Sequence, residues 1–171
     1  MLPAAGSPAS RVVDWQLAAV VAAALRPFTV LTGGPGTGKT ATVARILAVL
    51  HRLSPGLRVA LCAPTGKAAA RLAAAVAERS AGLPVPAGLA ATTLHRLLHY
   101  IGDTDSFRAG PDRLLPYDCV VVDEASMLDP AVLAVLLSSL PAAARLLPVV
   151  SCVLPWLLPS AAGRRRCRCR G

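Results

Sequence analysis

A glycine-rich segment, residues 33–40, has the composition and spacing of a phosphate-binding loop. It reads GGPGTGKT and fits the pattern G-x-x-x-x-G-K-S/T. Glycines allow successive backbone N–H groups to approach phosphate oxygens, and the start of the following helix adds the positive end of its dipole. The predicted nucleotide-binding residues of the loop are Gly33, Gly34, Pro35, Gly36, Thr37, Gly38, Lys39 and Thr40.

The last two residues of this loop have distinct predicted roles. Lys39 would reach the β- and γ-phosphates of ATP, and Thr40 would offer its hydroxyl to Mg²⁺. Among 18 basic side chains only Lys39 and Lys67 are lysine, which indicates that both sites need a compact ammonium charge. The alternative is a glycine turn with no ligand. The phosphate-binding interpretation is favoured because the loop lies between a predicted strand and a predicted helix.

Two adjacent carboxylates, Asp123 and Glu124, follow a run of valines that predicts a buried strand. Ligands of open parallel sheets bind at the carboxyl ends of the strands. Asp123 is therefore the expected partner of Mg²⁺, and Glu124 is the candidate to orient or deprotonate an attacking water. Alone, this pair would more often be two acids that begin a loop. Its occurrence downstream of a phosphate-binding loop favours the catalytic interpretation.

The elements expected to position these residues alternate between strands and helices. We predict helices over residues 12–25, 40–53, 66–79, 93–100 and 130–140, and strands over residues 28–32, 58–63 and 118–122. Loops are expected over residues 80–91 and 102–116. Each strand is a continuous apolar run, which is typical of a parallel sheet covered on both faces. The sequence thus predicts an α/β sandwich with a parallel sheet.

Length and composition are those of one globular domain, with 171 residues of which 54% are hydrophobic. The net charge of +9 overstates how basic the domain is, because five arginines crowd into residues 164–170. Five cysteines match neither a disulfide framework nor a metal site. The chain shows no secretory signal, and the apolar stretch 146–158 is shorter than the roughly 20 residues of a membrane span. A cytoplasmic protein without a membrane segment is expected.

Four motifs together resemble the RecD group of superfamily 1 helicases, the α subunit of exodeoxyribonuclease V. They are the loop GGPGTGKT and the segments APTGKAAARL (63–72), TLHRLL (93–98) and VVDEASML (121–128). The resemblance implies an incomplete RecA-like P-loop NTPase sandwich over residues 11–147, the first motor domain of a 5′ to 3′ DNA helicase that acts in double-strand-break repair and recombination. It also implies ATP and Mg²⁺ as cofactors, with single-stranded DNA and RecB-like and RecC-like subunits as partners.

The same resemblance suggests roles for residues outside the loop. Gln16 is similar to the glutamine that contacts the adenine edge, although a lone glutamine on a helix is more often solvated. The expected contacts to the DNA backbone are Pro64, Thr65, Gly66, Lys67, Thr93 and His95. Thr65 could instead cap the helix that it precedes, as Asp129 is expected to do. Contacts of this kind hold phosphates without recognising bases. A helicase motor needs such contacts because it moves along DNA of any sequence.

The resemblance ends after Leu147, where the family continues into a strand and a Gly-Asp-x-x-Gln motif. We interpret residues 148–171 as an aberrant, frameshifted or disordered tail and residues 1–10 as a flexible lead-in. The tail could instead be a basic nucleic-acid arm or, through Cys167 and Cys169, a metal site. A single motor domain is expected to bind ATP with little turnover. The rival functions are a catalytically silent ATP-binding fragment and a P-loop ATPase that does not act on DNA.

Overall fold

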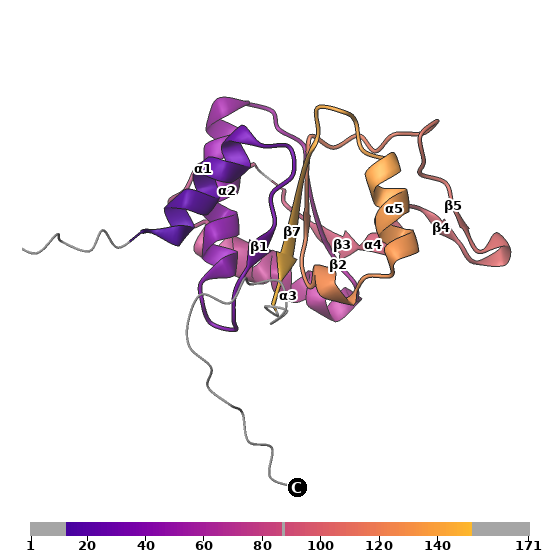
Figure 1. Cartoon of the computed structure of the whole chain (residues 1–171), viewed down its shortest axis with the longest axis horizontal. Coiled ribbons are helices and arrows are strands. Elements are labelled where there is room, and N and C mark those ends of the chain that lie inside the picture. The colour runs from indigo at the N-terminus through magenta and orange to yellow at the C-terminus, as the bar shows by residue number, and fades with distance from the viewer. Residues whose placement is uncertain (1–12, 87, 152–171) are drawn as a thin grey trace, which may run out of the picture.

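The computed structural model describes residues 13–86 and 88–151, which form a five-stranded parallel sheet with helices on both faces (Figure 1). The strand order is β1-β7-β6-β2-β3, and every neighbouring pair is parallel. The strands are β1 (Leu31–Thr32), β2 (Val59–Ala63), β3 (Ala91–Thr93), β6 (Cys119–Val122) and β7 (Arg145–Val150). The expected α/β fold with a parallel sheet is therefore confirmed.

The helices fall into two layers. One face carries α1 (Trp15–Leu25), α2 (Lys39–Leu53) and α3 (Gly66–Arg79), and the other carries α4 (Leu94–Leu97) and α5 (Pro130–Ser138). Alternate residues of each strand face opposite layers. Leu61 and Val121 belong to the core under α1, α2 and α3, whereas Ala60 and Val120 belong to the core under α4 and α5. None of these helices is long and apolar enough to cross a membrane.

Side-chain caps explain where three helices begin. Asp14 accepts hydrogen bonds from the backbone of Gln16 and Leu17, so α1 begins at Trp15 and not at residue 12. Thr65 accepts from the Ala68 backbone, and α3 has the bounds that the sequence predicted. Asp129 caps α5 as expected, with Pro130 at the first helical position.

Short elements were not anticipated from the sequence. A hairpin of β4 (Tyr100–Ile101) and β5 (Ser106–Phe107) overlaps the predicted loop 102–116, and β3 begins where a connector was expected to end. The predicted helix over 93–100 is only one turn long, because His99 adopts a left-handed backbone with φ of 54°. The predicted strand 28–32 is reduced to Leu31–Thr32, preceded by a single bridge at Phe28.

The domain boundary predicted after Leu147 falls inside a strand. β7 continues through Val150, pairs with β6 and β1, and buries Pro148 and Val149. The first three residues of the predicted tail thus belong to an interior strand of the sheet. Residues 1–12 and 152–171 lie outside the described residues, so the lead-in and the frameshifted tail stay predictions.

Candidate functional site

The glycine-rich loop connects the carboxyl end of β1 to the start of α2. Gly36 and Gly38 have φ values of 76° and 83°, which only glycine adopts at low cost. At Gly33 an added Cβ would lie 2.6 Å from the Thr37 hydroxyl. Gly38 occupies the N-cap position of α2 and supplies no side-chain hydrogen bond. The first backbone N–H groups of α2 therefore stay available to an anion.

The ammonium group of Lys39 lies over the loop. It donates hydrogen bonds of 2.9 Å and 2.8 Å to the carbonyl oxygens of Gly33 and Gly34. Thr37 donates to the same Gly34 carbonyl at 2.9 Å. Within the described residues the one ion pair joins Arg58 to Asp118, so no carboxylate neutralises Lys39. Its positive charge is free to meet phosphate oxygens.

The two carboxylates lie at the carboxyl end of β6, separated from β1 by one strand. Because these strands are parallel, Asp123 and the loop emerge at the same edge of the sheet. The Asp123 backbone donates to the Cys62 carbonyl at 2.8 Å, and its carboxylate accepts from the Glu124 backbone at 2.9 Å. Glu124 has a left-handed φ of 51°. Such backbone strain is frequent at functional sites.

Gln16 lies against the loop and not in open solvent. Its carboxamide nitrogen is 3.4 Å from the Thr37 carbonyl, and its oxygen accepts a 2.8 Å hydrogen bond from Arg45. An added Cβ at Gly38 would lie 2.8 Å from the same nitrogen. A pocket of about 300 Å³ opens beside these groups. Its lining is Trp15, Gln16, Ala19, Leu31, Thr32, Gly33, Thr37, Lys39 and Thr42.

Sequence reasoning missed two members of this site, Trp15 and Arg45. Trp15 precedes the predicted glutamine and is 77% exposed at the pocket. A large exposed aromatic side chain beside a cavity is the signal that could have identified it. Arg45 lies on the second turn of α2, and its contact to Gln16 joins residues 29 positions apart. Nothing local in the sequence indicates that contact.

The predicted DNA-contacting segments lie at the carboxyl ends of two neighbouring strands. Ala63 of β2 pairs with Thr93 of β3, so the segment 64–67 and His95 follow adjacent strand ends at one edge of the sheet. Lys67 and His95 are exposed there. Thr65 caps α3, as the alternative interpretation held. Thr93 likewise accepts from the Arg96 backbone at 3.3 Å.

Comparison with known proteins places the chain in a family. A family model described as AAA domain matches residues 16–150. The chain belongs to this AAA domain family. It is 48% identical over 145 residues to the RecBCD enzyme subunit RecD of Mycolicibacterium smegmatis, a match that covers 78% of the chain and 26% of the relative. The predicted resemblance to RecD is confirmed.

Two further matches define the extent of the likeness. The chain is 43% identical over 122 residues to the ATP-dependent RecD2 DNA helicase of Deinococcus radiodurans, covering 71% of the chain and 15% of that relative. The chain thus spans about a quarter or less of the length of these relatives. A DEAD box protein from Methanococcus jannaschii shares the fold, with a TM-score of 0.59 at 17% identity over 84% of the chain and 45% of that structure.

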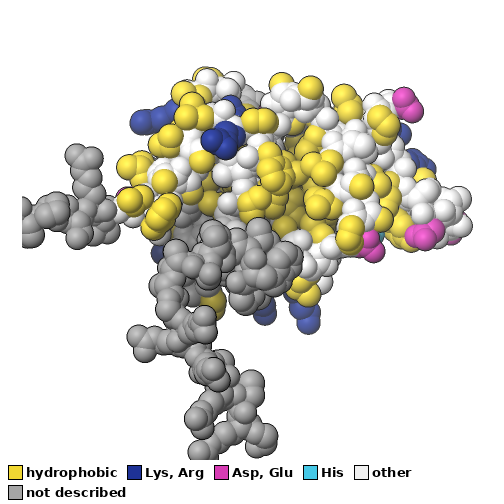
Figure 2. Space-filling view, in the orientation of Figure 1, with side chains coloured by type: hydrophobic (Ala, Val, Ile, Leu, Met, Phe, Trp, Pro, Cys, Tyr) yellow, Lys and Arg dark blue, Asp and Glu magenta, His cyan; other side chains and the backbone are white. Residues whose placement is uncertain are grey.

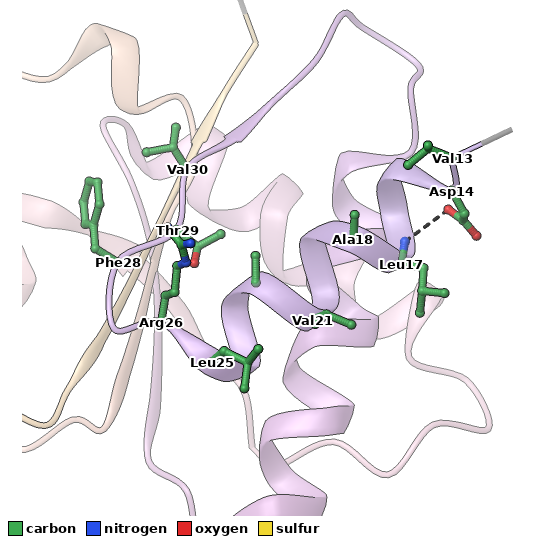
Figure 3. Close-up of a pocket in the computed structure, with 11 residues that line it drawn as sticks. Val13, Asp14, Leu17, Ala18, Val21, Leu25, Arg26, Phe28, Thr29 and Val30 are labelled. Atoms are coloured by element: carbon green, nitrogen blue, oxygen red, sulfur yellow. Dashed lines mark hydrogen bonds between the residues drawn. The ribbon is translucent and has the colours of Figure 1, made fainter. Parts of the chain in front are cut away.

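A larger groove of the AAA domain lies away from the glycine-rich loop and the two carboxylates. It has a volume of about 740 Å³ and runs between α1 and residues 26–30 (Figure 3). Leu17, Val21, Leu25 and Phe28 line it, and hydrophobic side chains gather over the same part of the surface (Figure 2). Its one carboxylate, Asp14, is engaged in capping α1. The smaller pocket at the loop is therefore the candidate site.

Proposed function

We propose that this chain is the ATP-binding first motor domain of a RecD-like 5′ to 3′ DNA helicase that acts in double-strand-break repair and recombination. The observation that carries the proposal is the uncompensated ammonium of Lys39, held over a loop that opens onto the start of α2. The names of the relatives, a RecBCD subunit and an ATP-dependent DNA helicase, support it. The alternative is an ATP-binding fragment with no catalytic role.

The nucleotide would lie across the loop with its phosphates at Lys39 and the first turn of α2. Gln16 would offer its carboxamide to the adenine edge from the pocket that it lines. Trp15, exposed at the same pocket, would shield the base from solvent. ATP bound in this way would have its γ-phosphate toward the carboxyl end of β6.

The side chains at this edge also fit Mg²⁺. Thr40 and Asp123 supply oxygen ligands, which Mg²⁺ prefers, and one Asp123 oxygen makes no hydrogen bond within the described residues. Bound there, the ion would neutralise charge on the β- and γ-phosphates. Glu124, next along the chain, would hold the attacking water. Its left-handed backbone turns the chain directly after Asp123.

The exposed surface at the carboxyl ends of β2 and β3 is the proposed path for single-stranded DNA. Lys67 would supply a charge, while Pro64 to Gly66, Thr93 and His95 would contact the sugar-phosphate backbone without recognising bases. RecB-like and RecC-like subunits would be the protein partners if the parent protein is of the RecBCD type. A cytoplasmic location follows from this proposed role.

The two lysines of the chain provide matched variants for the test. Lys39→Ala is expected to abolish binding of a fluorescent ATP analogue and to leave single-stranded DNA binding unchanged, because Lys39 lies at the phosphate loop. Lys67→Ala is expected to weaken single-stranded DNA binding and to leave nucleotide affinity unchanged. Both are measured by titration of the full chain. Equal nucleotide affinity of the wild type and Lys39→Ala would refute the proposed nucleotide site.

A further inference from the structure

A second pocket extends the proposed DNA path beyond β3. It has a volume of about 580 Å³ and lies between α4 and the β4–β5 hairpin, at the far end of the molecule from α1 (Figure 1). Its lining is Thr93, His95, Arg96, His99, Tyr100, Ile101 and Arg108. Thr93 belongs both to this hairpin pocket and to the proposed DNA path. A strand that follows β3 would thus continue into the pocket.

Three rings form a cluster at the hairpin pocket. The Tyr100 ring lies 5.3 Å from His95, nearly perpendicular to it, and 5.3 Å from Phe107. Unlike a core aromatic residue, Tyr100 is 41% exposed. Its hydroxyl donates a 2.7 Å hydrogen bond to Asp105, which fixes the ring direction. The structure therefore holds an aromatic ring open to solvent, next to two neighbouring rings.

The same pocket is positively charged. Arg96 and Arg108 line it and are exposed. Neither forms an ion pair within the part of the chain that the structure describes. One carboxylate of the hairpin, Asp105, accepts the hydrogen bond of Tyr100. The hydrogen bond to Asp105 also raises the pKa of Tyr100 above its usual value. Two guanidinium groups without an ion pair among the described residues thus line the same pocket as an exposed aromatic ring.

We infer that the hairpin pocket binds one nucleotide of a single-stranded nucleic acid, with its base stacked on Tyr100 and its flanking phosphates on Arg96 and Arg108. The inference rests on the proposed function, because Thr93 and His95 lead the strand to the pocket. Stacking on an aromatic ring tolerates any base, since every base has a π-face. Guanidinium groups pair with phosphate oxygens in the same way at every position along a strand.

The test measures binding of a labelled oligothymidylate to the full chain by fluorescence anisotropy. Tyr100→Leu should weaken binding about 5- to 150-fold, the range found when a stacking partner is removed. Tyr100→Phe should bind like the wild type, because it keeps the ring and loses only the Asp105 bond. Phe28→Leu is the control, since Phe28 is 52% exposed on the α1 side of the molecule. It should leave affinity unchanged, and circular dichroism checks that each variant is folded.

A second pair of measurements separates stacking from charge. With an oligonucleotide that carries abasic linkers, Tyr100→Leu and the wild type should bind equally. Arg108→Gln should reduce the slope of log affinity against log salt by about 0.7, the value for one phosphate of a single strand. The exposed Arg79→Gln at the end of α3 should not change that slope.

The outcomes distinguish this inference from the proposed function. If Lys67→Ala weakens binding and Tyr100→Leu does not, the hairpin pocket is not a nucleotide site, and the DNA path at β2 and β3 stands. If Tyr100→Phe weakens binding as strongly as Tyr100→Leu, the ring does not stack and the inference is wrong. If the wild-type chain binds no oligonucleotide, the DNA path and the inference both fail, and nucleotide binding at Lys39 is unaffected.

Discussion

Arg45 donates a 2.8 Å hydrogen bond to the carboxamide oxygen of Gln16, and this contact sets which way the glutamine faces. The carboxamide nitrogen then lies toward the loop, 3.4 Å from the Thr37 carbonyl. An adenine edge offers one donor and one acceptor, so a fixed carboxamide can match it. Guanine offers a carbonyl oxygen where adenine has its amino group. Arg45 is therefore a positioning residue for the proposed base contact.

Replacement of Gln16 should change base preference and not phosphate binding. Gln16→Ala is expected to weaken ATP binding about two- to tenfold, the value of one ordinary hydrogen bond, and to leave GTP binding unchanged. Arg45→Met should reduce the preference for ATP over GTP less than Gln16→Ala does, because the Gln16 carboxamide remains. Titration with both fluorescent nucleotides checks this, with the exposed Arg52→Met of the same helix as control. Equal losses for ATP and GTP would show that Gln16 does not contact the base.

Two glycines of the loop provide a matched pair for stability. Gly38→Ala and Gly36→Ala both place a side chain at φ near 80°, which costs about 1–2 kcal/mol. At Gly38 the new Cβ would also meet Gln16, whereas at Gly36 nothing lies within 4 Å. Urea unfolding should show a reduced free energy of unfolding for both variants, with the larger reduction for Gly38→Ala. Adding Gln16→Ala should remove the difference, and its persistence would exclude the Gln16 contact as the cause.

The Arg58–Asp118 pair predicts a pH dependence of stability. Hydrogen bonds from Arg58 hold the pKa of Asp118 below its usual value, so the pair stabilises the fold above the unfolded pKa. This contribution is lost as pH falls through the folded pKa. Asp118→Asn should therefore flatten the acid side of the stability curve. Urea midpoints between neutral pH and pH 3 measure this, and the exposed Asp112→Asn should retain the wild-type curve.

Much of the fold and of the site could be predicted from local sequence. The elements and contacts that were not predicted depend on residues far apart in the chain. The bounds of α3 are fixed by the Thr65 cap and an alanine-rich segment, and the loop is identified by its own spacing. By contrast β3 and the β4–β5 hairpin are two or three residues long, so their pairing depends on neighbours that local patterns do not contain. The Arg45–Gln16 contact likewise exists only because α1 packs on α2.

We expect the 171-residue chain to hydrolyse ATP far more slowly than a complete helicase would. The ammonium group of Lys39 is hydrogen-bonded to the loop, and the guanidinium group of Arg45 is hydrogen-bonded to Gln16. The match covers 26% of the RecD relative, and the remaining residues of that relative are the proposed source of further positive charge at the γ-phosphate. An arginine that stabilises the transferring phosphoryl group contributes about 10³ to 10⁵ in rate. The chain should therefore bind ATP and hydrolyse it very slowly.

Steady-state phosphate release by the full chain, with and without single-stranded DNA, measures this turnover. Any residual rate should fall further in Glu124→Gln, because the amide cannot accept a proton from water, while ATP binding is retained. Glu78→Gln is the matched control, since Glu78 lies near the end of α3 and away from the loop. DNA should not raise the rate, because the DNA path proposed at β2 and β3 brings no further positive charge to the γ-phosphate. DNA-stimulated turnover at helicase-like rates would show that the chain supplies its own γ-phosphate contacts, and the single-motor-domain proposal would then be wrong.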